Sequence, residues 1–312
     1  MWRTEEHEEL GSLVAGAPTH RPLTPWGMWL PMVTPMRAGA IDLPATSRLV
    51  EHYVRSGLDG LIILGTTGEG ALLSGEERRS VASAVLEAAG GALPVMAGVG
   101  AVDTRDVCRQ VRELDSLDLA GYLVPPPYYL RVSEAGMAWH FGEILKATGR
   151  PLMLYNVPKR TGGSMSVPLA ERLLAHPQIV AVKECDAANL RAMSRKAGVA
   201  VLCGEDGSML DHLLAAGAGA VPASAHIRPD LFVQLFRLAQ TGHTMAAMAL
   251  FAKLSRLISL LFAEPNPAPV KAALALEGRI AAEARLPLQP VSQSLMGQLE
   301  EAMSLLPPMK AA

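Results

Sequence analysis

Short apolar runs recur along the chain, separated by longer segments whose apolar residues follow helical spacing. Near-continuous apolar strands that alternate with amphipathic helices are typical of a parallel sheet covered on both faces. Eight such units predict a closed (β/α)8 TIM barrel. The alternative is an open, doubly wound sheet, but residues 28–35 lack the GxGxxG sequence that usually follows its first strand. The predicted strands are residues 28–33, 60–64, 94–97, 121–124, 151–155, 179–183, 199–203 and 218–222.

The strand pattern stops near residue 229, which divides the chain into three predicted parts. Residues 27–228 form the barrel, and residues 1–26, which show no strong periodicity, form an N-terminal extension. Residues 229–312 form a C-terminal helical appendage. Ser74, followed by Glu76 and Glu77, is expected to cap a helix within the barrel. Expected helices cover residues 44–56 and 75–89 in the barrel and 231–241, 245–262 and 269–277 in the appendage.

Composition narrows the class of protein. Of the 312 residues 50% are hydrophobic, and the formal net charge is −2 with scattered Lys and Arg. This distribution gives no basic face for nucleic acid or an anionic membrane, so a small-molecule ligand is expected. The acidic start lacks the apolar core of a signal peptide, and no stretch of about 18 uncharged apolar residues follows. Cys108, Cys185 and Cys203 form no CxxC pair. Together these features predict a soluble, cytoplasmic protein.

Lys183 is the first candidate for chemistry because it ends an apolar run. Burial disfavours an ammonium ion, so such a lysine can supply the free amine that attacks a carbonyl carbon and forms a Schiff base. On position alone, Lys183 can also point to solvent or pair with Glu184. In a barrel of this kind the strand ends share one rim, where active sites are built. The other strand ends therefore decide between these interpretations.

Further strand ends bring hydroxyl groups and an arginine to the same rim. Schiff-base chemistry on a 2-oxo acid needs an amine, donors for the substrate carboxylate and a proton shuttle. Tyr155 can reach the substrate oxygen, with Thr66 and Tyr129 passing the proton onward. Thr67 and the backbone N–H groups of a glycine-rich turn can bind one carboxylate, and Arg160 can hold a second. The motifs are GTTGEG at 65–70, PPPYY at 125–129 and YNVPKRTG at 155–162.

Each piece also has a purely structural explanation. GTTGEG can be only a tight turn, and it lacks the GK[ST] of a phosphate-binding P-loop. Tyr155 can simply pack at the barrel rim, and Arg160 can be a solvated surface charge. Their joint placement after consecutive strands favours a common site over coincidence.

A metal-dependent aldolase is the competing mechanism. It requires clustered His and carboxylate ligands, whereas the histidines are spread along the chain without a paired spacing. Only His226 lies near a strand end, where a pocket-lining or structural role is favoured. We therefore expect no metal or other cofactor, and activity that EDTA leaves unchanged. The histidines considered are His52, His140, His176, His212 and His226.

The motifs GTTGE, PPYY, YNVPKRTG and VKE, in this order on successive strands, resemble the dihydrodipicolinate synthase and N-acetylneuraminate lyase family of pyruvate-dependent class I aldolases. The resemblance covers about residues 27–290. It implies that Lys183 forms an imine with pyruvate. It also implies a proton relay of Thr66, Tyr155 and Tyr129. In that family the tyrosine matching Tyr129 comes from a neighbouring subunit, and the usual assembly is a homotetramer, a dimer of dimers.

The resemblance also implies which residues bind substrate. Thr67 binds the pyruvate carboxylate, and the backbone carbonyls of Gly204 and Val221 line the pocket beside the lysine. Arg160 matches the arginine that holds the carboxylate of aspartate semialdehyde, which sialic acid lyases generally lack. This arginine and the tail FAEPNPAPVK at 262–271 favour the synthase branch of the family. That branch condenses pyruvate with L-aspartate 4-semialdehyde to 4-hydroxy-tetrahydrodipicolinate in lysine and diaminopimelate biosynthesis. The tail is expected only to pack the helical appendage.

Several departures from the family pattern leave the aldehyde substrate open. Gly70 replaces the usual serine, Leu130 replaces a common asparagine, and residues 222–226 read PASAH in place of a polar run. The alternative is a paralogous aldolase or dehydratase for a sugar-acid derivative such as 2-keto-3-deoxygluconate. A non-enzymatic alternative is a keto-acid sensor that has lost catalysis, although no recognisable relay residue is missing.

The inhibitory lysine site of family members also differs here. Its histidine and asparagine ligands are replaced by Gly75, Arg78 and Val102. These residues cannot supply the same acceptors for a lysine ammonium group. We therefore expect L-lysine to inhibit weakly or not at all.

Overall fold

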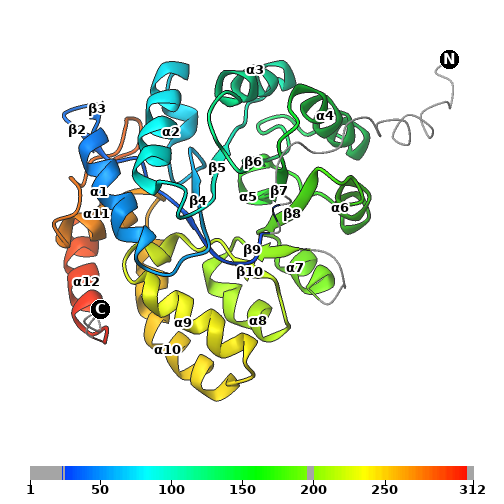
Figure 1. The fold of residues 1–312 in the computed structure, drawn as a ribbon. Coiled ribbons are helices and arrows are strands. Elements are labelled where there is room, and N and C mark those ends of the chain that lie inside the picture. Colours follow the sequence, from blue (N-terminus) through cyan, green and yellow to red (C-terminus); the bar gives the residue numbers. More distant parts are fainter. Residues whose placement is uncertain (1–22, 24, 195–199, 308–312) are drawn as a thin grey trace, which may run out of the picture.

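The computed structural model describes residue 23 and residues 25–194 and 200–307. Eight parallel strands close into a barrel, because β1 pairs with β10 on one side and with β4 on the other (Figure 1). The predicted TIM barrel is confirmed, and each predicted apolar run overlaps one strand. In pairing order the strands are β1 (Gly27–Pro31), β10 (Gly219–Ala220), β9 (Val201–Cys203), β8 (Ile179–Glu184), β7 (Leu152–Asn156), β6 (Gly121–Val124), β5 (Val95–Gly98) and β4 (Gly60–Ile63).

Helices follow the strands and surround the barrel (Figure 1). The expected helices at 44–56 and 75–89 correspond to α1 and α2. Ser74 caps α2 as predicted: its hydroxyl accepts from the Glu77 N–H, and the Glu77 carboxylate accepts from the Ser74 N–H. These helices are α1 (Leu43–Val54), α2 (Gly75–Ala89), α3 (Thr104–Leu114), α4 (Glu134–Ala147), α5 (Pro158–Thr161), α6 (Val167–Leu174), α7 (Ala187–Met193) and α8 (Met209–Leu214).

The hydrophobic pattern missed several short elements at the rim. A two-stranded hairpin follows β1, and 3-10 turns follow β4, β9 and β10. Elements of two to four residues are too short to produce a recognisable apolar period. They are β2 (Met36–Arg37), β3 (Ala40–Ile41), η2 (Gly70–Leu72), η3 (Asp206–Ser208) and η4 (Ala223–His226).

Four helices follow the barrel, and α11 and α12, orange to red, lie along one side of it (Figure 1). Among the described helices, α10 alone has the length and hydropathy that would suffice to cross a membrane. It buries one face, including Leu250 and Leu254, packs against α9 and α12, and exposes Lys253, as a packing helix does. Most of the expected N-terminal extension, residues 1–22 and 24, lies outside the described residues. The four helices are α9 (Pro229–Gln240), α10 (Thr244–Leu261), α11 (Ala268–Leu276) and α12 (Gln293–Ser304).

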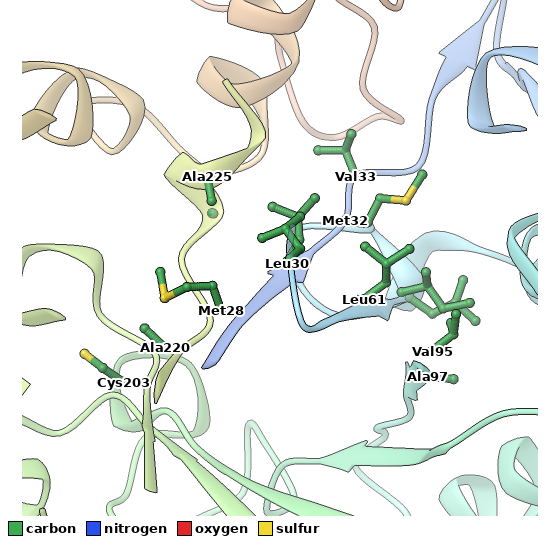
Figure 2. Close-up of a cluster of buried hydrophobic side chains, with 14 of the residues drawn as sticks. Met28, Leu30, Met32, Val33, Leu61, Val95, Ala97, Cys203, Ala220 and Ala225 are labelled. Carbon is green, nitrogen blue, oxygen red and sulfur yellow. The ribbon is translucent and has the colours of Figure 1, made fainter. Parts of the chain in front are cut away.

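Two sets of buried side chains come from opposite faces of the strands. One set fills the barrel and the other packs against the helices, because successive side chains of a strand point to opposite faces. On β1, Trp29 belongs to the interior set, whereas Met28 and Leu30 belong to the outer set (Figure 2). The same alternation on β8 puts Lys183 on the inner face with Ala181. The interior set is Trp29, Ile62, Met96, Leu123, Met153, Tyr155, Val157, Ala181, Leu202 and Val221.

Candidate active site

Lys183 and Tyr155 face each other inside the carboxyl end of the barrel. They are register partners on the neighbouring strands β8 and β7, and their exposed fractions are only 6% and 8%. The Lys183 Nζ atom lies 4.5 Å from the centroid of the Tyr155 ring. The Glu184 carboxylate is hydrogen-bonded to Asn156 instead, whose Nδ2 donates to its two oxygens at 2.8 and 3.0 Å. The alternatives in which Lys183 points to solvent or pairs with Glu184 are therefore wrong.

Thr66, in the loop after β4, lines the same cavity as this pair, and its hydroxyl influences the Tyr155 phenol. Burial raises the pKa of the Tyr155 phenol above its ordinary value. The Lys183 ammonium and the Thr66 hydroxyl oppose this shift without cancelling it. The phenol is therefore protonated at neutral pH and can donate a proton to a substrate oxygen.

A cavity of about 310 Å³ opens in front of Lys183. The loops after five different strands contribute to its wall, as expected where parallel strands end together. Of the residues predicted from sequence, all except Tyr129 line this cavity. They are Lys183, Tyr155, Thr66, Thr67, Arg160, Gly204 and Val221.

Gly204 occupies a position beside Lys183 that has no room for a side chain. A Cβ atom built on Gly204 would lie 2.5 Å from the Cys185 Sγ and 2.9 Å from the Lys183 Cε. Real Cβ atoms essentially never make contacts under 3.0 Å. The glycine therefore lets the lysine chain extend across the β9 end into the cavity.

Tyr129 is the predicted relay residue that the chain does not bring to the cavity. Its side chain is 90% exposed, and its backbone lies in the left-handed region at φ 72°. This conformation is costly for a residue other than glycine, and such strain gathers at functional sites. Tyr128 turns inward instead, and its hydroxyl donates to the Gly100 carbonyl at 3.4 Å.

A second cavity, of about 370 Å³, adjoins the first. Thr66, Tyr155 and Arg160 line both cavities, so they stand where the two meet. The outer wall of the second cavity includes apolar residues such as Leu72 and Val99. The exposed Arg160 guanidinium makes no hydrogen bond or ion pair with the residues that the structure describes, so it is available to an anion.

Sequence reasoning missed two ionisable groups in the Lys183 cavity. The Asp206 carboxylate is buried and accepts from the Ser224 N–H at 2.8 Å and the Ala223 N–H at 3.3 Å. Burial raises the pKa of Asp206 to about 6, although these N–H groups and Lys183 act in the opposite direction. Burial also raises the pKa of the Cys185 thiol to about 12. The available signal was their place in the sequence: Asp206 lies two residues after Gly204, and Cys185 two residues after Lys183.

The C-terminal appendage reaches the glycine-rich loop of the site. Asn266, between α10 and α11, donates through Nδ2 to the Thr67 Oγ1 at 2.9 Å. Glu69, two residues after Thr67, forms a buried ion pair with Lys271 of α11 and accepts from the Arg285 N–H at 2.7 Å. The expectation that this tail only packs the appendage was therefore too narrow.

His226 has a structural role rather than a ligand role. Its Nε2 accepts from the Val33 N–H at 3.0 Å, and its Nδ1 donates to the Ala223 carbonyl at 2.7 Å. Burial lowers the pKa of His226 to about 4, so the ring is neutral at pH 7. Within residues 23, 25–194 and 200–307, no three His, Cys, Asp or Glu side chains are grouped to hold a metal ion.

Comparisons with known proteins agree with the predicted family. A sequence model of the Dihydrodipicolinate synthetase family matches residues 25–306. The "4-hydroxy-tetrahydrodipicolinate synthase 2" of Clostridium acetobutylicum is 33% identical over 280 residues, 88% of this chain and 98% of the relative. The corresponding synthase of Anaeromyxobacter sp. is 36% identical over 283 residues, 89% of this chain and 96% of the relative. A solved monomeric dihydrodipicolinate synthase variant is 32% identical with a TM-score of 0.87, covering 90% of this chain and 96% of its own.

Proposed function

Because this chain belongs to the dihydrodipicolinate synthetase family of class I aldolase-type lyases, we propose that it condenses pyruvate with L-aspartate 4-semialdehyde. The product is 4-hydroxy-tetrahydrodipicolinate, an intermediate of lysine and diaminopimelate biosynthesis in the cytoplasm. Arg160 is the observation that supports this choice of second substrate. Its guanidinium has no hydrogen-bond or ion-pair partner among the described residues and lies where the two cavities meet. A guanidinium binds a carboxylate in a bidentate pair, and the semialdehyde brings such a carboxylate.

Lys183 is proposed as the nucleophile. Its amine attacks C2 of pyruvate, and a proton delivered by Tyr155 lets the C2 oxygen leave as water, which gives the imine. The Tyr155 phenol can act as this donor because its pKa is raised. The Thr66 hydroxyl, which lines the same cavity, offers the route by which the proton is replaced.

The pyruvate carboxylate is proposed to bind at the glycine-rich loop. Thr67 is buried and lines the Lys183 cavity, and its hydroxyl offers a donor there. The backbone carbonyls of Gly204 and Val221 are proposed to face the imine from β9 and β10. Carbonyl oxygens at that position accept hydrogen bonds from the hydroxyl or N–H groups of reaction intermediates.

Carbon–carbon bond formation follows from the imine. Loss of a methyl proton gives an enamine, whose carbon attacks the aldehyde carbon while the new alkoxide takes a proton from the relay. The amino group of the second substrate then displaces Lys183 from C2, which closes the ring and frees the lysine. Arg160 holds the carboxylate of the second substrate during these steps.

The relay is proposed to be completed by Tyr129 of a partner subunit. Within one chain this side chain is 90% exposed and contributes to neither cavity. Tyr128 lines the second cavity together with Thr66 and Tyr155, and the apolar residues of its wall are of the kind against which an incoming tyrosine ring packs. The proposed assembly is therefore at least a dimer, and a dimer of dimers by resemblance to the family.

Steady-state kinetics with two aldehydes test the choice of substrate. Pyruvate is assayed with aspartate semialdehyde and with glyceraldehyde, for wild type, Arg160→Ala and Arg172→Ala, an exposed arginine on α6 as the matched control. We expect the wild type to prefer the semialdehyde. Arg160→Ala should lower its kcat/KM by about 10- to 100-fold, since hydrogen bonds to charged groups contribute about 1.5–3 kcal/mol.

The controls fix the interpretation of this assay. Arg172→Ala should match the wild type, and the KM for pyruvate should be similar in all three proteins. A wild-type preference for glyceraldehyde, or full activity on the semialdehyde in Arg160→Ala, would contradict the proposal. The first of these results would favour the sugar-acid aldolase.

A further inference from the structure

We infer that Asn266 is a positioning residue for pyruvate, because its amide orients the Thr67 hydroxyl hydrogen toward the Lys183 cavity. The inference deepens the proposed function and rests on it, since there Thr67 binds the pyruvate carboxylate. Asn266 itself touches no reacting atom in this account. It comes from the segment between α10 and α11, 199 residues from Thr67 in sequence.

The direction of the hydrogen bond between the two side chains is decisive. A threonine hydroxyl has one hydrogen to donate and two lone pairs, whereas an amide nitrogen only donates. The Asn266 Nδ2 donates to the Thr67 Oγ1 at 2.9 Å, which occupies a lone pair and leaves the hydroxyl hydrogen unused. In the described part of the chain, this oxygen has no other hydrogen-bond partner. The hydrogen is therefore left for a ligand in the cavity that Thr67 lines.

A hydrogen directed into the cavity suits an anion. A carboxylate oxygen only accepts hydrogen bonds, so it requires a hydroxyl that presents its hydrogen and not a lone pair. An apolar residue in place of Asn266 would leave the hydroxyl free to rotate. An acceptor in the same place would draw the hydrogen away from the cavity.

Asn266 is a poor choice for stability alone. Its Oδ1 is enclosed by protein and has no hydrogen-bond partner among the described residues. A buried carbonyl oxygen without a partner carries a free-energy penalty that an apolar side chain of similar size would avoid. Residues that break such a local rule are expected at functional positions.

The loop itself is held by other contacts. Glu69 is fixed by Lys271 and by the Arg285 N–H, and the Glu69 N–H donates to the Thr66 carbonyl at 3.1 Å. Replacing Asn266 therefore changes the hydroxyl of Thr67 while the backbone of the loop keeps its anchors. This separates an effect on pyruvate from an effect on folding.

The experiment compares Asn266→Leu, which removes the amide, with Asn266→Asp, which turns the donor into an acceptor. Each protein is titrated with pyruvate, the imine is reduced with borohydride, and the adduct at Lys183 is quantified by intact mass. We expect the half-saturating pyruvate concentration to rise about 10-fold in Asn266→Leu, equivalent to about 1.4 kcal/mol. Asn266→Asp should weaken pyruvate binding further. The melting temperature of Asn266→Leu should equal or exceed that of the wild type.

A double-mutant cycle with Thr67→Val completes the test. If Asn266 acts through the Thr67 hydroxyl, Asn266→Leu has no further effect on pyruvate in the Thr67→Val background. The inference is overturned if Asn266→Leu melts at a lower temperature with an unchanged pyruvate titration, or if the two effects add fully. A wild-type protein that forms no adduct would instead overturn the proposed imine chemistry, so the two failures are distinguishable.

Discussion

The Lys183 Nζ lies over the ring of Tyr155, 4.5 Å from its centroid, and the two residues are register partners on adjacent strands. A cation over an aromatic face is attracted to it, so the ring holds the amine at the mouth of the cavity. The hydroxyl of the same residue faces the cavity that Thr66 also lines. The ring of Tyr155 thus positions the amine, whereas its hydroxyl is the proposed proton donor, and the two roles can be separated by mutation.

Tyr155→Phe should separate these tasks, because it keeps the ring and removes the proton donor. We expect kcat to fall by about 10²- to 10⁴-fold, the usual contribution of a positioned acid or base. Lys183 should still form an adduct with pyruvate when incubated for long enough before reduction. Steady-state assays measure kcat, and rapid-quench kinetics measure the rate and final extent of adduct formation. An unchanged kcat and an unchanged rate of adduct formation in Tyr155→Phe would exclude the phenol as proton donor.

Gly204→Ala should impair imine formation without unfolding the barrel. The added methyl group would stand within 3.0 Å of the Lys183 side chain and of the Cys185 Sγ. Such overpacking costs about 1–3 kcal/mol, and displacing the lysine chain relieves it. The control is Gly207→Ala, where a Cβ meets nothing within 4 Å. If Gly204→Ala gave the same adduct yield as the wild type, the added methyl group would not displace the Lys183 side chain, which would contradict this prediction.

Acid should destabilise the protein partly through His226. The folded-state pKa of His226 is lowered to about 4, whereas an unfolded histidine titrates near 6.5, so between these values the unfolded chain binds an extra proton. The contribution of this pKa difference to the free energy of unfolding is fully present above about pH 6.5. It is lost as the pH falls, and the loss reaches about 3 kcal/mol at pH 4.

Denaturant unfolding of wild type and His226→Gln at several pH values tests this titration. The variant loses the hydrogen bonds of the ring and should be less stable at pH 7. The difference between the two free energies of unfolding should shrink toward pH 4, because the variant has no ring to protonate. Parallel curves across this window would show that His226 does not titrate as described.

The barrel could be predicted from sequence because its strands are buried on both faces. Burial on both faces produces continuous apolar runs, and a charged residue at the end of one, Lys183, stands out against them. The glycine-rich and tyrosine motifs could be placed at one rim because parallel strands end together. Five of the residues that line the Lys183 cavity were accessible in this way: Lys183, Tyr155, Thr66, Thr67 and Arg160.

The contacts made by the appendage could not be predicted in the same way. Asn266 meets Thr67 across 199 residues, and Lys271 meets Glu69 only after α11 has packed against the barrel. The spacing of apolar residues within a short segment gives no information about contacts between residues so far apart in the sequence. The left-handed backbone of Tyr129, a residue other than glycine, was equally hidden, although the family resemblance implied that this tyrosine serves a neighbouring subunit.

L-Lysine should not regulate this protein. Gly75, Arg78 and Val102 stand where lysine-inhibited relatives are expected to carry acceptors. The Arg78 guanidinium lies 3.5 Å from the Gly70 carbonyl and would repel a lysine ammonium. Initial rates should be nearly constant from zero to millimolar L-lysine. Loss of most activity at low-millimolar lysine would contradict this expectation.

The central claim is that Lys183 forms an imine with pyruvate, and borohydride trapping followed by intact mass and peptide mapping tests it most directly. We predict one pyruvyl adduct per wild-type chain, located on Lys183, and none in Lys183→Ala. Lys271, the other buried lysine among the described residues, should stay unmodified because it is ion-paired with Glu69. An adduct on a different lysine, or no adduct with pyruvate, would contradict the account.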